Sequence, residues 1–248
     1  MSAEKSKGGI GETVRTIVYA VLIAGVIRTL AFEPFNIPSE SMLPTLLVGD
    51  YLFVSKYSYG YSRHSLPWSP NLFSGRVMED VPKRGDIAVF KLPRDNSTDY
   101  IKRIIGLPGD RIQMKQGELF LNGELVTRKR INDFAYRDGF GNVYFVPQYR
   151  ETLPNGASYL TLDLLQNSDH DDTREYLVPP GHYFAMGDNR DNSLDSRVDS
   201  AVGLVPAENL VGRAEILFFS TNGSARFWEF WNWPFAVRYG RLFDGLRT

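Results

Sequence analysis

The chain has 248 residues, enough for one large domain or two modest ones, and 43% of them are hydrophobic, so it can build a sizeable core. Its 28 basic and 29 acidic residues give a formal net charge of −1, which argues against nucleic acid as a main partner because phosphate binding needs a basic surface. The absence of cysteine excludes structural disulfides, thiol catalysis and cysteine-ligated metal sites. The three histidines, His64, His170 and His182, are too scattered for a local zinc motif.

The most apolar stretch lies near the N-terminus. Residues 16–27, TIVYAVLIAGVI, carry no charge, and residues 14–32 supply the roughly 20 residues that a helix needs to cross a bilayer if Arg15 and Arg28 extend towards opposite surfaces. The alternatives are an amphipathic or buried helix and a cleaved signal peptide. No small-residue cleavage site follows the stretch. We therefore expect a retained transmembrane signal anchor at 14–32, preceded by a short N-terminal segment at 1–13.

Positive charges are distributed unevenly around this stretch. Lys5, Lys7 and Arg15 lie at or before its start, whereas no lysine or arginine occurs between Arg28 and Lys56. The positive-inside rule therefore predicts that the N-terminus lies in the cytoplasm and the rest of the chain outside it.

The segment IPSESMLPTL at 37–46 holds two serines spaced by one residue, Ser39 and Ser41, between Pro38 and Pro44. Proline fixes its own φ and biases the preceding residue towards extended backbone, so the segment should be stiff, with its hydroxyl groups at set positions. A serine hydroxyl is a weak nucleophile until a base takes its proton, and no neighbouring histidine or acid is an obvious base.

Short segments rich in β-branched and aromatic residues follow, separated by Gly, Pro, Asn or Asp. They cover residues 50–59, 85–92, 99–107, 117–126, 181–187 and 213–220. Asn122-Gly123 in one of them is a two-residue hairpin signal, and only 160–166 and 206–211 show a brief helical pattern. The predicted fold is mainly β: a single N-terminal transmembrane helix, then an antiparallel β domain with an inserted smaller β region.

Composition also suggests where regions of the chain begin and end. Between 131 and 176, glycine, asparagine, tyrosine and acidic residues become frequent, and we interpret this stretch as the inserted β and loop region. The main β domain then comprises 33–130 and 177–224, with 57–82 as an extended hairpin excursion. Residues 225–248 form an aromatic C-terminal tail, which either lies at the membrane interface that tryptophan favours or docks on the domain.

A lysine can serve as the base for a serine if burial lowers its pKa from about 10.4 towards neutrality. Lys102 is the best candidate, because on a strand of period two it shares a face with Tyr100 and Ile104, where its charged form is disfavoured. The alternative is an edge-strand lysine that prevents aggregation. Taken alone, the pattern favours that alternative.

The stretch GDNRDNSLDSR at 187–197 is dense in polar side chains. Asp191, Ser193 and Asp195 alternate as in a calcium loop, but the glycine at loop position six and the closing glutamate at position twelve are absent. The alternative is a network of Asx turns with an Asp–Arg pair that holds a loop, which suits a supporting role in a catalytic site. The acidic stretch around His170 is interpreted as a solvated loop rather than a metal site.

Four motifs stand in order behind the anchor. They are PSESMLPTL (38–46), GDYLFVSK (49–56), RGDIAVFK with YIKRIIGLPGD (84–91 and 100–110), and GDNRDNSLDSR (187–197). The combination closely resembles bacterial type I signal peptidases, or leader peptidases, the membrane-bound Ser-Lys proteases that remove signal peptides from exported proteins. The resemblance covers most of 30–130 and 177–220 and little of the inserted region.

The resemblance implies that Ser41 is the nucleophile and Lys102 its general base. The oxyanion would be held by the Ser41 backbone N–H and the Ser39 hydroxyl, which explains why two serines lie one residue apart. Ser193 would hydrogen-bond the lysine amine and orient it.

The resemblance also implies a set of supporting residues. Asp195 and Arg197 would form the ion pair that holds the loop, and Phe90 and Tyr100 would be among the apolar groups covering the lysine. The substrate pockets would accept only small side chains, as in Ala-X-Ala cleavage sites. Their walls would be Ile37, Pro38, Met42, Leu46 and Ile101.

No metal or organic cofactor is implied. The expected partners are secretory preproteins and membrane lipid, and the enzyme would be a monomer that crosses the bacterial cytoplasmic membrane once, with its catalytic domain on the outer, periplasmic side. Many enteric relatives have two transmembrane helices and some carry a disulfide near the catalytic domain. This chain has one candidate helix and no cysteine.

Two alternative functions make different demands on the chain. A self-cleaving Ser-Lys protein resembling the SOS repressors would need a DNA-binding N-terminus, where this chain has its apolar stretch. A non-catalytic, membrane-tethered β-module would keep its function when Ser41 is replaced.

Overall fold

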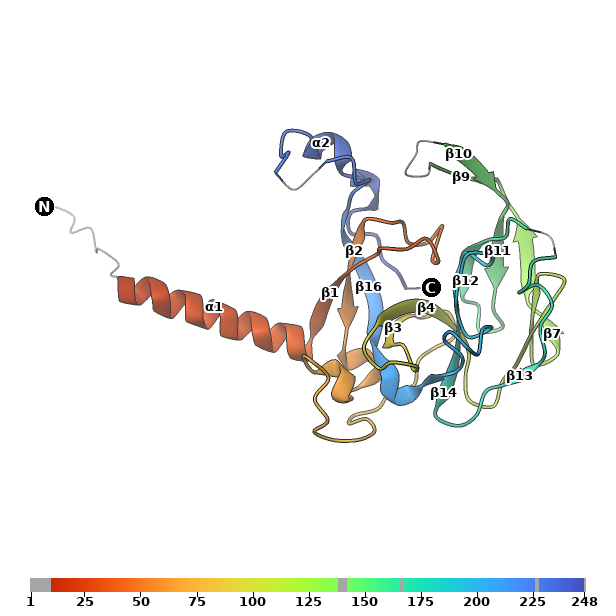
Figure 1. Cartoon of the computed structure of the whole chain (residues 1–248), viewed down its shortest axis with the longest axis horizontal. Helices are drawn as coiled ribbons and strands as arrows, with labels where there is room; N and C mark the ends of the chain where they lie inside the picture. The colour runs from red at the N-terminus through yellow and green to blue at the C-terminus, as the bar shows by residue number, and fades with distance from the viewer. Residues whose placement is uncertain (1–9, 138–141, 166, 226–227, 248) are drawn as a thin grey trace, which may run out of the picture.

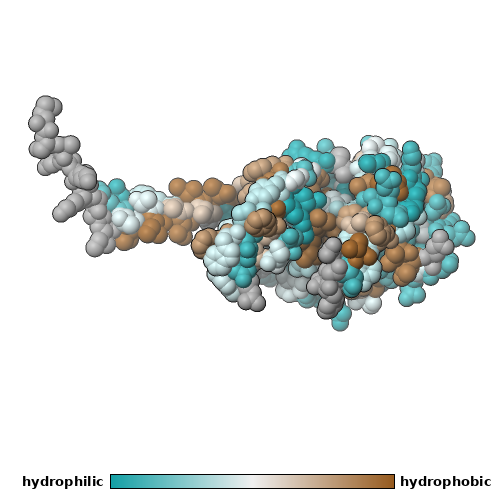
Figure 2. Space-filling view, turned by 90° about the horizontal axis from the view of Figure 1, so that it is seen from above, coloured by the Kyte–Doolittle hydropathy of each residue, from teal (hydrophilic) through white to brown (hydrophobic). Residues whose placement is uncertain are grey.

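The computed structural model describes residues 10–137, 142–165, 167–225 and 228–247. One long helix, α1 (Ile10–Leu30), projects from a body of β-strands (Figure 1). At 1.5 Å per residue, its 21 residues extend for about 30 Å, the thickness of the hydrocarbon core of a bilayer. The body buries none of the stretch Gly11–Leu30, and apolar side chains cover the middle of the helix (Figure 2). By length and composition, α1 can cross a membrane.

Seven antiparallel strands form the main sheet, in the spatial order β1-β2-β16-β3-β4-β14-β15, and the sheet curls into a half-barrel (Figure 1). The strands are β1 (Phe32–Asn36), β2 (Asp50–Ser55), β16 (Leu210–Ser220), β3 (Ile87–Lys91), β4 (Asp99–Gly106), β14 (His182–Met186) and β15 (Val205–Pro206). Because β1 follows α1 directly, the edge of the sheet begins where the helix ends.

The central pair of this sheet, β3 and β4, places Val89 opposite Ile101 and Ala88 opposite Lys102. Successive side chains of a strand point to opposite faces, so these two pairs lie on different faces. Val89 and Ile101 pack into a buried cluster that also contains Ile37 from the serine segment. Ala88 belongs to a second cluster on the other face. The strand register therefore decides which face Lys102 occupies.

Residues 111–177 supply the strands of the smaller sheets. A four-stranded sheet has the order β13-β5-β6-β7, a three-stranded sheet has the order β12-β11-β8, and β9 pairs with β10. The strands are β5 (Arg111–Lys115), β6 (Glu118–Leu121), β7 (Glu124–Leu125), β8 (Thr127–Arg130), β9 (Phe134–Arg137), β10 (Val143–Val146), β11 (Gln148–Thr152), β12 (Ser158–Leu162) and β13 (Tyr176–Leu177). Asn122 and Gly123 turn between β6 and β7 with φ of 56° and 84°, as the hairpin signal predicts.

The segment 57–82 contains two 3₁₀ turns, Tyr57–Tyr59 and Arg63–Ser65, and a single bridge between Tyr61 and Val77 closes it. It is a loop rather than a regular extended hairpin.

The C-terminal tail folds back on the main sheet and includes the short helix α2 (Trp233–Ala236) and a 3₁₀ turn, Tyr239–Arg241. Bridges join Val237 to Thr221 and Gly245 to Ile216, and Arg241 pairs with buried Asp50 at 2.6 Å. The end of the tail is thus docked on the main β domain, although Trp228 and Trp231 remain largely exposed.

One local expectation is wrong. Of the stretch 160–166, the described residues 160–165 do not form a helix, because β12 runs to Leu162 and pairs with β11, where Leu162 lies opposite Gln148. Strand pairing outweighs the weak helical preference of this stretch. At 206–211, a 3₁₀ turn covers only Ala207–Asn209 before β16 begins. The mainly β fold behind one apolar helix is confirmed.

Candidate active site

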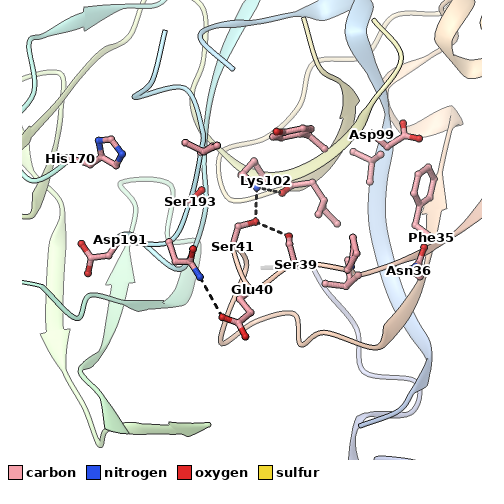
Figure 3. A pocket seen from close by; sticks show the side chains of 17 residues that line it. Phe35, Asn36, Ser39, Glu40, Ser41, Asp99, Lys102, His170, Asp191 and Ser193 are labelled. Carbon is pink, nitrogen blue, oxygen red and sulfur yellow. Dashed lines mark hydrogen bonds between the residues drawn. The ribbon is translucent and has the colours of Figure 1, made fainter. Parts of the chain in front are cut away.

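Ser41 and Lys102 meet although 61 residues separate them in the chain (Figure 3). The Lys102 Nζ donates a hydrogen bond of 2.7 Å to the Ser41 Oγ and another of 3.0 Å to the carbonyl oxygen of Ile101. Ser41 lies in the turn that follows β1, and its carbonyl accepts a hydrogen bond from the Asn189 backbone N–H. Ser41 is thereby fixed from both sides, by β4 and by the loop after β14.

Lys102 is buried, and burial lowers its pKa from 10.5 to about 8, while the carboxylates of Asp195 and Asp188 oppose that shift. The ring of Tyr100 lies 5.4 Å from its Nζ, and Phe90 lies next to that ring, with 6.2 Å between the centroids. An amine with this pKa is neutral in an appreciable fraction of molecules near neutrality. Lys102 can therefore accept the Ser41 proton.

The Ser39 hydroxyl lies 3.4 Å from the Ser41 Oγ and is partly accessible. Both side chains face the same cavity (Figure 3). A hydroxyl at this distance can donate to an oxygen atom attached to a carbon that Ser41 has attacked.

The loop 187–197 lies against the dyad. The Asp195 carboxylate forms a buried ion pair with the Arg197 guanidinium through two bonds of 2.9 Å and also accepts the Gly187 N–H. Ser193 is buried and faces the cavity, yet in the described residues no hydrogen bond joins it to Lys102. Its predicted orienting role stays a prediction.

Gly187 permits this close packing. A Cβ at this position would lie 2.2 Å from the Ser193 Oγ and 2.5 Å from the Ser41 carbonyl oxygen, distances that side chains do not tolerate. Glycine is needed here for the approach of two segments.

Sequence reasoning missed a second buried ion pair. Arg103, the residue after Lys102, donates to both oxygens of Asp188 at 2.8 and 2.7 Å, and the Thr45 hydroxyl donates to the same carboxylate at 2.6 Å. This network joins the lysine strand to the segment behind the serine. Its sequence signal was an arginine directly before the apolar residues Ile104 and Ile105 of the strand, because a buried arginine needs a partner.

The network continues into the three-stranded sheet. The Arg103 guanidinium stacks on the Tyr159 ring at 4.3 Å, the Tyr159 hydroxyl donates to Glu151, and Glu151 pairs with buried Arg190 at 2.6 Å. The inserted strands therefore hold the polar loop that contacts the dyad.

A cavity of about 590 Å³ surrounds the dyad. Its lining comes from residues 35–41, Val89, residues 99–102, His170 and residues 191–194. Its apolar lining includes Ile37, Val89 and Ile101. Among the labelled residues, the acidic Asp191 and the apolar Phe35 lie on opposite sides of Ser41 (Figure 3). Of the predicted pocket residues, Ile37, Pro38 and Ile101 line the cavity.

Two predicted pocket residues lie outside the described lining of the cavity. Met42 and Leu46 are fully buried in the core cluster that contains Ile37. From there they can support the pocket floor, and their direct contact with a substrate stays a prediction.

The three histidines lie in different parts of the structure. His170 lines the cavity, whereas buried His64 lies in the 3₁₀ turn Arg63–Ser65 and the His182 Nδ1 lies 3.1 Å from the Pro180 carbonyl oxygen. None of the three forms a hydrogen bond with Ser41 in the described part of the chain.

Asp191, Ser193 and Asp195, whose spacing suggested a calcium loop, do not converge on one cation site. Asp195 is engaged by Arg197, and Asp191 accepts two backbone N–H groups, from Leu164 and Leu165. Asp191 instead lies within 4.8 Å of two other carboxylates, which belong to Asp163 and Asp171. Asp163 pairs with Arg128, and Asp171 accepts hydrogen bonds from Ser168, so these acids already have protein partners.

Comparison with known proteins gives one consistent result. Residues 10–219 match the family model described as "Signal peptidase, peptidase S26". The chain is 39% identical to signal peptidase I of Rickettsia typhi, over 98% of this chain and 96% of the relative. It is 37% identical to signal peptidase I of Rickettsia conorii, over 99% and 98% of the two chains. A crystal structure of a signal peptidase I from Enterococcus faecalis matches with 23% identity and a TM-score of 0.31, over 54% of this chain and 97% of the other.

Proposed function

The chain belongs to the signal peptidase I family of peptidases, which remove signal peptides from preproteins, and we propose that it does so with Ser41 as nucleophile and Lys102 as general base. The observation that carries the proposal is the 2.7 Å hydrogen bond between the Lys102 Nζ and the Ser41 Oγ, in a place where burial lowers the lysine pKa to about 8. A neutral amine at this distance can take the proton that the hydroxyl must lose.

The reaction is an acyl transfer in two steps. The Ser41 Oγ attacks the scissile carbonyl carbon while its proton passes to the Lys102 Nζ, and the resulting oxyanion accepts hydrogen bonds from the Ser41 N–H and the Ser39 hydroxyl. The intermediate collapses to an acyl-enzyme, and the protonated lysine gives its proton to the departing amine of the mature protein. Lys102 then takes a proton from water, which attacks the ester, and returns that proton to the Ser41 Oγ as the signal peptide is released.

The open edges of the main sheet support binding of an extended substrate. Among the described strands, β1 pairs with β2 only, so its other edge is free. On its β14 side, β4 is paired only from Arg103 onward, so the segment 99–102 is also open there. A peptide strand added between these edges would have its backbone polar groups satisfied and would pass next to Ser41.

The apolar end of the cavity supports specificity for small residues. Ile37, Val89 and Ile101 are branched side chains that narrow the space beside the dyad. We propose that the residue before the scissile bond lies there and that alanine fits, in agreement with Ala-X-Ala sites.

The test compares two preproteins that differ in the residue before the scissile bond. The alanine form should be cut there, as read from the masses of both products. The leucine form should lose well over roughly tenfold in kcat/KM, because one methylene group in a pocket changes discrimination by about 1–3 kcal/mol. Equal cleavage of both forms would contradict the pocket assignment, and no cleavage of the alanine form by the wild type would contradict the proposed function.

The family and α1 indicate a membrane-anchored protein. We propose that it is a monomer of the bacterial cytoplasmic membrane with its N-terminus inside, because the cationic residues before the helix follow the positive-inside rule.

Protease added to intact spheroplasts should cleave the chain beyond residue 33. A cytoplasmic protein in the same cells should resist, which controls for lysis. Cleavage of the chain only after lysis would contradict the proposed orientation.

A further inference from the structure

A second cavity of about 480 Å³ lies where α1 joins the β body. We call it the junction cavity. Gly25, Arg28 and Thr29 of α1 form one wall, and the loop 66–69 with its fully exposed Trp68 forms another. The remaining walls come from β1, Lys56, His64, the β3–β4 region and Val211.

The junction cavity adjoins the catalytic cavity. Phe35 of β1 and Asp99 of β4 line both of them. The strand β1 runs along this path from the outer end of α1 to the serine segment, and its five residues extend for about 16 Å at 3.2–3.4 Å per residue. A substrate segment of about five extended residues would match β1 in length, and the serine segment follows β1 directly.

The charges of the junction cavity are paired within the protein. Lys56 and Arg28 pair with Glu33 at 2.9 and 3.0 Å, and Lys91 pairs with Asp99 at 2.9 Å. A site for a phosphate group needs cations that are free to bind it, as at a basic surface. The three cations outnumber the two carboxylates by one, but each cation is already held in an ion pair. Such walls suit a polar peptide, such as the short stretch between the apolar segment of a signal peptide and its cleavage site, rather than a phosphate group.

Two of the three α1 residues that line the junction cavity are small. Gly25 and Thr29 lie one turn apart on the same face, and a Cβ added at Gly25 meets no atom within 4 Å. Small residues at this spacing let another helix approach closely in a bilayer.

We propose that the Gly25–Thr29 face of α1 and the junction cavity form the docking site for the upstream part of the signal peptide, an inference that rests on the proposed function. The apolar segment of the substrate lies on this face within the bilayer. Its polar stretch passes through the junction cavity, past Phe35 and Asp99, and presents the scissile bond to Ser41.

The test adds a bulky side chain to the Gly25–Thr29 face of α1, at a residue outside the lining of the catalytic cavity. Gly25→Leu has room for its side chain, so the protein should fold, and Ala24→Leu adds a similar bulk at the same depth outside the lining. Each variant is measured with a full-length preprotein in vesicles and with a short peptide that spans only the cleavage site. For Gly25→Leu we expect KM for the preprotein to rise about tenfold, the size of effect that misfit in an apolar contact produces. Cleavage of the peptide, and both activities of Ala24→Leu, should stay within about twofold of wild type.

Three results would overturn the inference. The first is unchanged preprotein cleavage by Gly25→Leu. The second is an equal loss on the peptide, which would mean that the substitution disturbs the catalytic cavity. The third is a loss on both substrates in vesicles but on neither in detergent, which would assign the junction cavity to lipid. Failure of the wild type to cut either substrate would instead refute the proposed function.

Cross-linking gives a readout that does not depend on turnover. Because the chain has no cysteine, a single cysteine reacts without background. In the Ser41→Ala background, Thr29→Cys should form a disulfide with a cysteine at the end of the apolar segment of a bound preprotein. Ile27→Cys should not, because it lies about 200° away around the helix. Equal yields from the two positions would contradict the docking face.

Discussion

Lys102→Arg is expected to be as inactive as Lys102→Ala, although the substitution keeps the charge and nearly keeps the length of the side chain. Arginine stays protonated because its pKa exceeds about 12, so it cannot accept the Ser41 proton near neutrality. Loss of a general base typically costs about 10²–10⁴-fold in rate, and a base used in both half-reactions could cost more. The measurement is kcat/KM on a preprotein for the two variants and the wild type.

Histidine variants are the matched controls. His170→Ala removes the histidine that lines the cavity, and His182→Ala removes one outside it. Both should keep most of the activity. An active Lys102→Arg together with an inactive histidine variant would replace the Ser-Lys assignment by a histidine base.

The pH profile tests the same base in the wild type. Because Lys102 acts only when its amine is neutral, and burial lowers its pKa to about 8, kcat/KM should rise as the pH increases through about 8. A profile that instead rises through the ordinary histidine pKa, near 6.5, would contradict the lysine.

Stability separates loss of chemistry from loss of fold. The lysine pKa is 10.5 ordinarily and about 8 when folded, a difference worth at most about 3 kcal/mol, by which the buried charge destabilises the protein below pH 8. Lys102→Met should therefore unfold with a higher free energy than wild type at neutral pH. The gap should shrink as the pH rises from about 8 towards 10.5, where the lysine is neutral in both states.

Ser41→Ala is expected to abolish cleavage while the chain still folds, because the side chain loses only its hydroxyl and its buried neighbours are unchanged. Activity should fall to the level left by binding and oxyanion stabilisation alone, with a loss similar to that of Lys102→Ala. Mass spectrometry of the preprotein after long incubation measures it. Full activity of this variant would support the non-catalytic β-module instead.

Two further variants sharpen this result. The double variant Ser41→Ala with Lys102→Met should be no less active than either single variant, because residues that act as one unit are not additive. Ser39→Ala should lose less, about 10²–10³-fold in kcat, because it removes one oxyanion donor and leaves the dyad intact. A double variant far below both single variants would mean that the two residues act separately.

Several features were readable from the sequence because their causes are local. The helix α1 follows from a stretch without charge, and the turn at Asn122-Gly123 follows from the left-handed backbone that these residues tolerate. The place of Lys102 on one strand face with Tyr100 and Ile104 also follows from a period of two, although the pattern alone favoured an edge-strand lysine over the buried one observed. In each case the signal lies within a few residues of its effect.

Other features depended on contacts between distant segments. Met42 and Leu46 are apolar like the residues that line the cavity, and only the fold places them in the buried core cluster. The pairing of Arg103 with Asp188 links positions 85 residues apart, which no local pattern specifies. Residues 160–162 illustrate the same limit, because pairing with β11 made this part of a helical pattern into a strand.

The sequence by itself determined that this protein has one bilayer-length helix, a β body and a serine and a lysine of the types that acyl transfer needs, because these depend on composition and period. Only the tertiary structure decided that the two side chains meet at 2.7 Å, since that distance is set by the register of β4 and the turn after β1. The tertiary structure also decided that the catalytic and junction cavities share Phe35 and Asp99. Cavities form between segments that are remote in sequence, and their shape follows from how the curled sheet brings those segments together.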